Sequence, residues 1–357
     1  MSFRRGDPCD QYADAAPLDL LRNFWTFSGQ VANRPTTDIT GGIEGGGAIV
    51  FPSGMSSSLL NPDYTLTGTI VMAQFFLKVD HDPTVNETLC AWDEGAGEPV
   101  NGYSIRLKPN GVISVLARGG SITYDSPNNT ITPGVYQYIE FRGELIDDGA
   151  EFELIVNKML VISETNANAG GSWPGNVRFF FSRSGYTNEI HIDDFLLMDG
   201  DDTGDGFTEL QGVKVMSTLL PTADTVDTEW SGTFEDINDE LPGGSDGDTS
   251  FMVATASLQN NLVEHEPLDA AATGIVGVFV LHDMKSDDGN TVPSTASALK
   301  QPSTTSELSL GDLSGKIDED PNEYQILNEG VIFPNDPDAL EWTPELVNTC
   351  IFGAKLG

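Results

Sequence analysis

The sequence is poor in cysteine and has no long apolar run. Its three cysteines, Cys9, Cys90 and Cys350, lie far apart and form no C-x-x-C pair. An odd number of cysteines cannot form a closed disulfide framework, and cysteine metal sites need closely spaced pairs. No stretch of about 18 apolar residues is present. We therefore expect free thiols, as in a reducing cytoplasm, and no membrane insertion.

Basic residues are also scarce. The 357 residues include 17 Lys and Arg against 55 Asp and Glu, which gives a formal net charge of −38. Charge of this sign repels phosphate backbones, so nucleic acid is excluded as a partner. The simplest consequence of the charge is solubility. MSFRRGDPCDQYADAAP at the start has no apolar segment behind its arginines, so we expect no secretory signal.

The common catalytic motifs are missing too. We find no G-x-S-x-G, P-loop or G-x-G-x-x-G string. The four histidines, His81, His191, His265 and His282, lack zinc-ligand spacing, so a zinc site is not expected. The glycine-rich GGIEGGG (41–47) precedes a strand-like run rather than a helix, which favours a turn.

What the sequence does have is turns and short β-patterned segments. Its 38 glycines and 20 prolines favour β structure over long helices. Asn110-Gly111 predicts a hairpin turn because both residues accept positive φ, and Asn157-Lys158 predicts a second turn. The spacing predicts an all-β chain whose first part is an antiparallel sandwich or jelly roll. The strand-like segments of that part are 69–79, 102–126, 134–145, 151–164, 176–184 and 189–200.

The second half has a looser β pattern. Residues 212–221 form a strand-like run, and 274–287 predict a nearly continuous apolar strand buried on both faces. Residues 298–322 are rich in Ser, Thr and Asp and are expected to form surface loops. TPE (343–345) predicts the start of a short helix, and IFGAKL (351–356) a final strand.

Several segments carry a family resemblance. One set resembles the laminin-G/concanavalin-A-like jelly rolls of tailed-bacteriophage virion proteins. It comprises Trp25, GGIEGGGAIVF (41–51), YSIRLKPNGVISVLA (103–117), ITPGVYQYIEFRGEL (131–145), FELIVNKMLVI (152–162) and IDDFLLMDG (192–200). A second set is similar in content and order to a module that follows such jelly rolls in phage structural proteins. It comprises GVKVMSTLLPTADTVDTEW (212–230), DINDELPGGSDGDTSFM (236–252) and LEWTPELVNTCIFGAKL (340–356).

The resemblance implies a domain plan and a role. The plan is an N-terminal arm (1–17), a jelly roll (18–200), an acidic linker (201–211) and a smaller β-rich virion module (212–357). The role is a non-enzymatic structural subunit of the particle, either decorating the capsid or associated with the neck, tail or fibre. Its partners would be other virion proteins and further copies of itself. It would be assembled in the host cytoplasm and reside in the virion. The arginines of the arm suggest that it docks on a neighbouring subunit.

Two alternatives remain open for the jelly roll. The first is a glycan-binding adhesin for host surfaces, since sandwich lectins use an aromatic platform beside polar groups. The second is a glycosidase. Aromatic residues near predicted loops are candidates for the platform, although each is also suited to packing in a loop-side core. These residues are Trp92, Tyr103, Tyr124, Trp173 and Tyr186.

The closest match to a pair of catalytic carboxylates is EIHIDD (189–194). Glu189, His191 and Asp193 share one strand face because side chains alternate along a strand. The string resembles the E-x-D-x-x-E strand of laminarinase-type sandwiches. It has histidine in place of the central acid, however, and lacks the last glutamate. A family-wide strand that ends in paired aspartates also accounts for the acids, so catalysis is not expected.

The stretch DGDDTGDGF (199–207) resembles part of a calcium loop. Asp199, Asp201 and Thr203 match the first EF-hand ligand positions, and Asp205 adds another oxygen donor. The bidentate glutamate of an EF-hand is missing, because Leu210 occupies position 12. We interpret the stretch first as an interdomain connector. Calcium is the one cofactor that it suggests.

Overall fold

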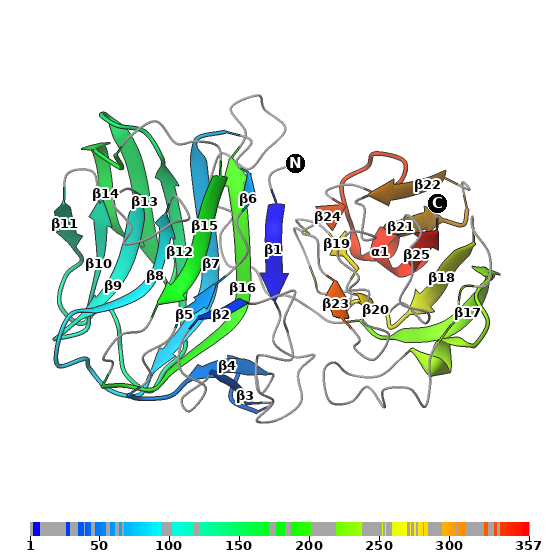
Figure 1. Ribbon diagram of the computed structural model, residues 1–357, viewed down its shortest axis with the longest axis horizontal. Helices are drawn as coiled ribbons and strands as arrows, with labels where there is room; N and C mark the ends of the chain where they lie inside the picture. Colours follow the sequence, from blue (N-terminus) through cyan, green and yellow to red (C-terminus); the bar gives the residue numbers. More distant parts are fainter. Residues whose placement is uncertain are drawn as a thin grey trace. The chain divides into compact units, whose positions relative to one another are not determined.

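The computed structural model divides the chain into two compact units, Met1–Met216 and Ser217–Gly357 (Figure 1). The structure describes residues 3–7, 26–28, 35–38, 40–43, 47–54, 58–60, 64–65, 68–93, 102–117, 121–170, 176–182, 187–200, 219–237, 252, 254, 259–269, 272, 275, 278–280, 282–284, 295–303, 306–310, 325–327, 332–333 and 336–356. The predicted acidic linker, 201–211, lies outside these residues. No helix within the described part of the chain is long and apolar enough to cross a membrane.

The strands described in the first unit form two eight-stranded antiparallel sheets (Figure 1). The β16 sheet has the order β14-β13-β12-β7-β16-β4-β3, and β1 also pairs with β16. Its strands are β1 (Phe3–Asp7), β3 (Thr36–Asp38), β4 (Ala48–Phe51), β7 (Ile70–Val79), β12 (Gln137–Glu144), β13 (Ala150–Val156), β14 (Met159–Ala167) and β16 (Ile190–Gly200).

The other sheet, the β15 sheet, has the order β11-β10-β9-β8-β15-β5-β2, and β6 also pairs with β15. Its strands are β2 (Thr26–Ser28), β5 (Ser58–Leu60), β6 (Tyr64–Thr65), β8 (Glu87–Asp93), β9 (Tyr103–Lys108), β10 (Val112–Ala117), β11 (Ile122–Asp125) and β15 (Asn176–Ser182). The two sheets form the predicted jelly-roll sandwich.

Aromatic side chains fill the space between the two sheets. Phe179 of β15 stacks on Phe195 of β16 with ring centroids 5.0 Å apart, and Trp92 of β8 lies 4.8 Å from Phe141 of β12. All four are fully buried or nearly so. Burying rings of this size contributes roughly 1.5–3 kcal/mol each, which explains why the aromatic strands of the sequence face inward.

Both predicted hairpin turns are confirmed. Asn110 and Gly111, between β9 and β10, have φ of 64° and 62°. Asn157 and Lys158 have φ of 50° and 68° and form a two-residue turn between the paired residues Val156 and Met159. Two consecutive positive φ values between directly paired residues, as at Asn157-Lys158, are what a type I′ hairpin turn requires, whereas the β9–β10 loop has three residues, 109–111, between the paired Lys108 and Val112.

Part of the predicted N-terminal arm belongs to the jelly roll itself. Residues 3–7 form β1, which pairs antiparallel with β16, so that Phe3 lies opposite Met198 and Asp7 opposite Phe195. The backbone of this segment is therefore hydrogen-bonded within its own chain, and docking of the arm on a neighbouring subunit stays a prediction. The charged sequence of residues 3–7 did not predict this strand, because strands pair through backbone groups and not through side chains.

The second unit contains a five-stranded sheet, the β25 sheet, in the order β17-β18-β25-β21-β22. Its strands are β17 (Pro221–Thr228), β18 (Asn260–His265), β21 (Thr295–Gln301), β22 (Ser306–Leu310) and β25 (Ile351–Leu356). The remaining described elements are short: η4 (Phe234–Asp236), β19 (Val278–Phe279), β20 (His282–Met284), β23 (Gln325–Leu327), β24 (Ile332–Phe333) and α1 (Pro344–Thr349). Strand β19 pairs with β24, and β20 with β23.

Two predictions for this unit are wrong. The apolar segment 274–287 is not one continuous buried strand, because it contains the separate strands β19 and β20, and Ile275, Val278 and Val280 are only partly buried. The segment 298–322, predicted as surface loops, begins with the paired strands β21 and β22, and residues 311–322 lie outside the described residues. Polar β21 is buried on both faces, since Leu299 packs in one cluster with Phe333 and Trp342 and Ala298 in another with Leu262 and Ile351.

The end of the chain is as predicted. Helix α1 begins after Thr343, whose side chain accepts a hydrogen bond from the Leu346 amide, and Pro344 occupies its first turn. The IFGAKL segment then forms β25, which lies between β18 and β21.

Candidate functional site

The face of the β16 sheet that points away from the β15 sheet carries polar side chains. Gln74 and Phe76 of β7 alternate with Phe75, whose ring contacts Phe181 in the core. Polar residues on this face are almost fully buried, with Gln74 and Glu140 each 1% exposed. Because a buried polar group is costly unless it has partners, this row is an ordered hydrogen-bonding layer rather than a random surface. Its main members are Gln74, Tyr138, Glu140, His191 and Asp193.

Tyr138 lies at the centre of this layer. Its hydroxyl donates a hydrogen bond to Oε1 of Gln74 at 2.9 Å, and its ring lies 5.5 Å from that of Phe76. Burial raises the pKa of Tyr138 far above its usual range, and the neighbouring Glu140 carboxylate raises it further. The hydroxyl therefore stays protonated and acts as a hydrogen-bond donor.

Asp193 and Asp194 have a structural role. The register of β16 shifts between Asp193 and Leu196, and Asp194 has a positive φ of 48°, as in a β-bulge. The Asp193 carboxylate accepts hydrogen bonds of 2.7 Å from the Asp194 amide and from the Ile43 amide. It fixes the bulge to the 40–43 turn, which accounts for this buried acid without catalysis.

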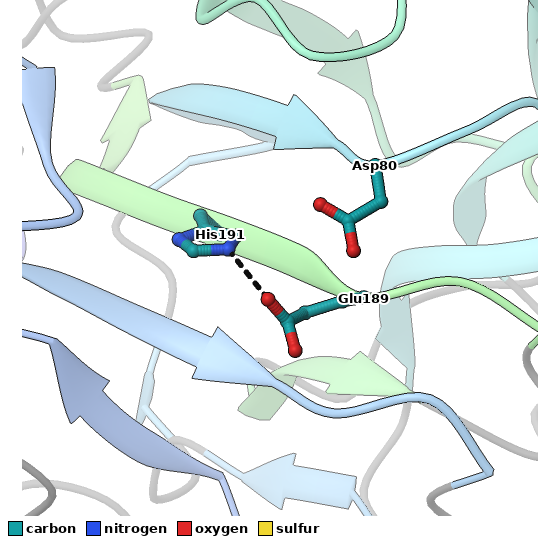
Figure 2. Close-up of side chains that lie close together, drawn as sticks. All are labelled: Asp80, Glu189 and His191. Carbon is teal, nitrogen blue, oxygen red and sulfur yellow. Dashed lines mark hydrogen bonds and ion pairs between the residues drawn. The ribbon is translucent and has the colours of Figure 1, made fainter.

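A more exposed cluster lies where β7 ends and β16 begins (Figure 2). It consists of Asp80, Glu189 and His191, and one donor atom from each lies within 4.8 Å of the others. His191 Nε2 is 3.0 Å from Oε1 of Glu189. Figure 2 shows the two carboxylates and the imidazole turned toward a common space. The arrangement provides two anionic oxygen donors and one nitrogen donor.

The three residues differ in exposure. Asp80 is exposed, Glu189 is half-buried, and His191 is 6% exposed. Lys78, opposite His191 in the sheet, directs its ammonium group toward the Tyr136 ring, 5.2 Å from the centroid. The site is thus open on the Asp80 side and closed beneath the imidazole.

Two of the aromatic residues predicted as a glycan platform are not on a surface. Trp92 and Tyr103 are both 0% exposed and pack between the sheets, so the platform prediction is wrong for these two. Tyr124 on the edge strand β11 is half-buried, with its ring 5.1 Å from that of Phe152. Trp173 and Tyr186 lie outside the described residues.

The predicted calcium stretch is mostly outside the described residues. The backbone of Asp199 is the next-to-last position of β16, opposite Val71. Asp201, Thr203 and Asp205 fall in the part of the chain that the structure does not describe. Calcium binding there stays a prediction.

Of the predicted glycosidase string, Glu189 and His191 do face one another, as strand alternation requires. The residue that sequence reasoning missed is Asp80, which joins them from a different strand. The signal that might have identified it is weak: an acidic residue directly after the long apolar strand 69–79, at the end where an antiparallel partner begins.

Comparisons with known proteins assign no family to this chain. No protein-family model matches the chain, and no curated protein matches it. A carbohydrate esterase of the Shiga toxin-encoding bacteriophage phi24B matches 53% of this chain and 98% of its own, at 14% identity and a TM-score of 0.36. The carbohydrate-binding module CBM66 of Bacillus subtilis matches 49% of this chain and 95% of its own, at 13% identity and a TM-score of 0.32.

A sialidase also matches 56% of this chain, at 13% identity and a TM-score of 0.39, but the match spans only 19% of the sialidase. At these identities and TM-scores the likeness carries no conclusion about the family or the chemistry of this chain.

Proposed function

We propose that the jelly roll is a glycan-binding module of a non-enzymatic structural subunit of a tailed-phage particle. The observation that supports glycan binding is the open cluster at the end of β7. The Asp80 carboxylate makes no hydrogen bond or ion pair with any described residue. Among the described residues, the Glu189 carboxylate interacts only with the His191 ring. Carboxylates placed in this way accept hydrogen bonds from the hydroxyl groups of a sugar.

A glycan array with the full chain tests this proposal. The D80N/E189Q pair should remove the signal, since it changes two acceptors without changing side-chain size. The matched control is E264Q/E341Q, which removes the same charge from exposed positions in the second unit. Loss of signal in the first pair alone supports the proposal. Absence of any binding by the wild-type chain, with and without calcium, overturns it.

The proposed virion role has a separate support and a separate test. Its support is the ordered resemblance of segments in both halves of the chain to phage structural proteins. Mass spectrometry of purified particles should detect the protein, and immunogold labelling should place it on head or tail. Its absence from particles of a phage that encodes it would overturn the virion role and leave glycan binding untouched.

A glycosidase is a second candidate, favoured by one distance. Oxygens of Asp80 and Glu189 lie within 4.8 Å of one another, close to the roughly 5–5.5 Å between the carboxyl groups of retaining enzymes. Turnover of β-glucans by the wild-type chain that is lost in E189Q would establish this candidate. No turnover, or turnover unchanged in E189Q, would eliminate it.

A further inference from the structure

We propose that Asp80, Glu189 and His191 bind a divalent transition-metal ion of the Zn²⁺ type. This inference goes beyond glycan binding and does not rest on it. The three donor atoms already lie within 4.8 Å of one another (Figure 2). In a tetrahedral site with bonds of about 2.0–2.1 Å, ligand atoms are about 3.3 Å apart. The 3.0 Å between His191 Nε2 and Glu189 Oε1 is close to this spacing, and the Asp80 oxygen lies within 4.8 Å of both.

The backbone brings the three side chains onto one face. Val79 pairs with Ile190 and Lys78 with His191, so the next position places Asp80 opposite Glu189. The Asp80 amide donates to the Glu189 carbonyl at 3.2 Å, which continues the strand pairing by one residue. Glu189 and His191 are two residues apart and therefore also share this face.

This pairing has an electrostatic cost that a cation would remove. Like charges directly opposite one another on antiparallel strands are destabilising. No described basic side chain forms an ion pair with Asp80, and the cationic Lys78 on the same face interacts with the Tyr136 ring. A bound divalent ion would neutralise both carboxylates at once.

His191 gives a second, independent reason. Its side chain is more than nine-tenths buried at the base of the cluster, and its Nε2 is the ring atom that faces the carboxylates. The imidazole has one polar partner, Glu189, and presents Nε2 to the space between the carboxylates. A buried imidazole aimed at two carboxylates is typical of a metal ligand rather than of a solvated surface histidine.

The donor set favours zinc-like ions over calcium. Calcium takes six to eight oxygen ligands, whereas this site offers one nitrogen and two carboxylates. Zinc accepts nitrogen and carboxylate together, and three protein ligands leave its fourth position open. The exposed Asp80 side of the cluster is where that open position would face. The same open position would accept a hydroxyl from a sugar or from water.

A bound ion would also fix the ends of two strands. Residues flanking the cluster already hold the adjoining loops together, since the Thr187 amide and hydroxyl donate to Glu87 and the Asn188 side-chain amide donates to the His81 carbonyl. An ion between Asp80 and the start of β16 adds a link that exists only in the folded state. It should therefore raise the melting temperature of the jelly roll.

Titration of the full chain with Zn²⁺ alone tests the site, with Co²⁺ as a coloured probe of coordination. We expect one saturable equivalent in the wild-type chain and binding at least about tenfold weaker in D80N and in E189Q. The E264Q/E341Q control should bind as the wild type does. No saturable Zn²⁺ or Co²⁺ binding overturns the proposal. Equal affinity in D80N and wild type also overturns it, because the ion would then lie elsewhere, such as the 199–205 stretch.

A melting experiment in chelator separates ligation from a structural role. Without metal, D80N should melt at or above the wild-type temperature, because it relieves repulsion with Glu189, and only the wild type should gain stability from Zn²⁺. A lower melting point for D80N in chelator would overturn the repulsion argument. Because these measurements contain no sugar, failure of glycan binding does not affect them.

Discussion

The two units of this chain differ in the hydrophobic core that stabilises each of them. Among the described residues, all but one of the largest fully buried side chains lie in the jelly roll, where rings from both sheets contact several others; the exception is Phe333. The described part of the second unit has a smaller cluster in which Leu299, Phe333 and Trp342 are the largest members, beside Val347 and Cys350. A large core distributes the cost of a defect over many contacts, whereas a small one cannot. The same change should therefore have unequal effects in the two units.

The largest effect is expected from Gly353→Ala in the second unit. A Cβ at Gly353 would lie 1.8 Å from the Asn261 carbonyl oxygen, a backbone atom of the neighbouring β18. To accept it, the β25 sheet must separate at its centre, at a cost of about 3 kcal/mol or more. Calorimetry should show loss of the second unit's unfolding transition with the jelly-roll transition retained.

Gly143→Ala is the matching change in the jelly roll. Its Cβ would meet ring atoms of Phe141 and Tyr103 at 2.7 and 2.8 Å, which are side-chain atoms. Rings can shift where a backbone carbonyl cannot, so G143A should lower the jelly-roll midpoint without abolishing its transition. If G143A proves the more damaging of the two, the proposed difference between the units is wrong.

The next comparison removes the same ring from both cores. Phe179 and Phe333 are each 0% exposed, and replacing a buried Phe with Ala costs about 3–5 kcal/mol. Phe333→Ala leaves its carbonyl able to accept the Trp342 indole hydrogen bond of 2.7 Å, so it tests the ring alone. We expect F333A to unfold the second unit at 37 °C, and F179A to leave a folded, less stable jelly roll. Limited proteolysis distinguishes these outcomes, and equal sensitivity of the two units would contradict the comparison.

The sequence was sufficient wherever local chemistry determines structure. Asn110-Gly111 and Asn157-Lys158 form turns because of the φ values that these residues accept, and Thr343-Pro344 starts a helix for the same kind of reason. Strand 295–301 was missed because the burial of Ala298 and Leu299 depends on β25, which lies about 50 residues later in the sequence.

The candidate site shows the same limit. Strand alternation alone placed Glu189 and His191 on one face. Asp80 joins them only through the register between β7 and β16, which pairs residues more than 100 positions apart. Trp92 and Tyr103 were predicted as a surface platform because they lie near predicted loops, but both lie inside strands with their rings in the core. The register between two strands is set when the sheet folds, so the pairing of residues that are far apart cannot be predicted from a single sequence.

Alkaline pH should lower the unfolding free energy of the jelly roll more than that of the second unit, by a smaller amount than the substitutions above. Burial raises the pKa of Tyr103 and Tyr138 far above the usual value near 10. Above pH 10 the unfolded chain loses these protons and the folded jelly roll keeps them. Its free energy of unfolding should therefore fall with rising pH, by up to about 1.4 kcal/mol per pH unit for each tyrosine. Tyr138→Phe should remove about half of this extra slope.

The second unit provides the control for that experiment. Among the described residues, each unit has one buried thiol with a raised pKa, Cys90 in the jelly roll and Cys350, raised to about 12, in the second unit. The two units should lose stability at similar rates between about pH 8 and 9, where an unfolded thiol ionises and an unfolded tyrosine does not, and diverge from about pH 9 upward. Calorimetry across this range measures both slopes. Divergence that begins below about pH 9 would rule out tyrosine as its cause.

The smallest expected effect is a gain, and it concerns one turn of the jelly roll. Lys158 is an exposed residue with φ of 68° between β13 and β14, where a side chain costs about 1 kcal/mol that glycine avoids. Lys158→Gly should raise the jelly-roll unfolding free energy by about 0.5–1 kcal/mol and leave the second unit unchanged. Lys158→Ala removes the same charge and keeps the Cβ, so it should give no gain. Equal gains from both variants would assign the effect to charge rather than to backbone strain. Asn157 is the poorer position for this change, because its side-chain oxygen accepts the Tyr138 amide at 2.9 Å and glycine would forfeit that bond.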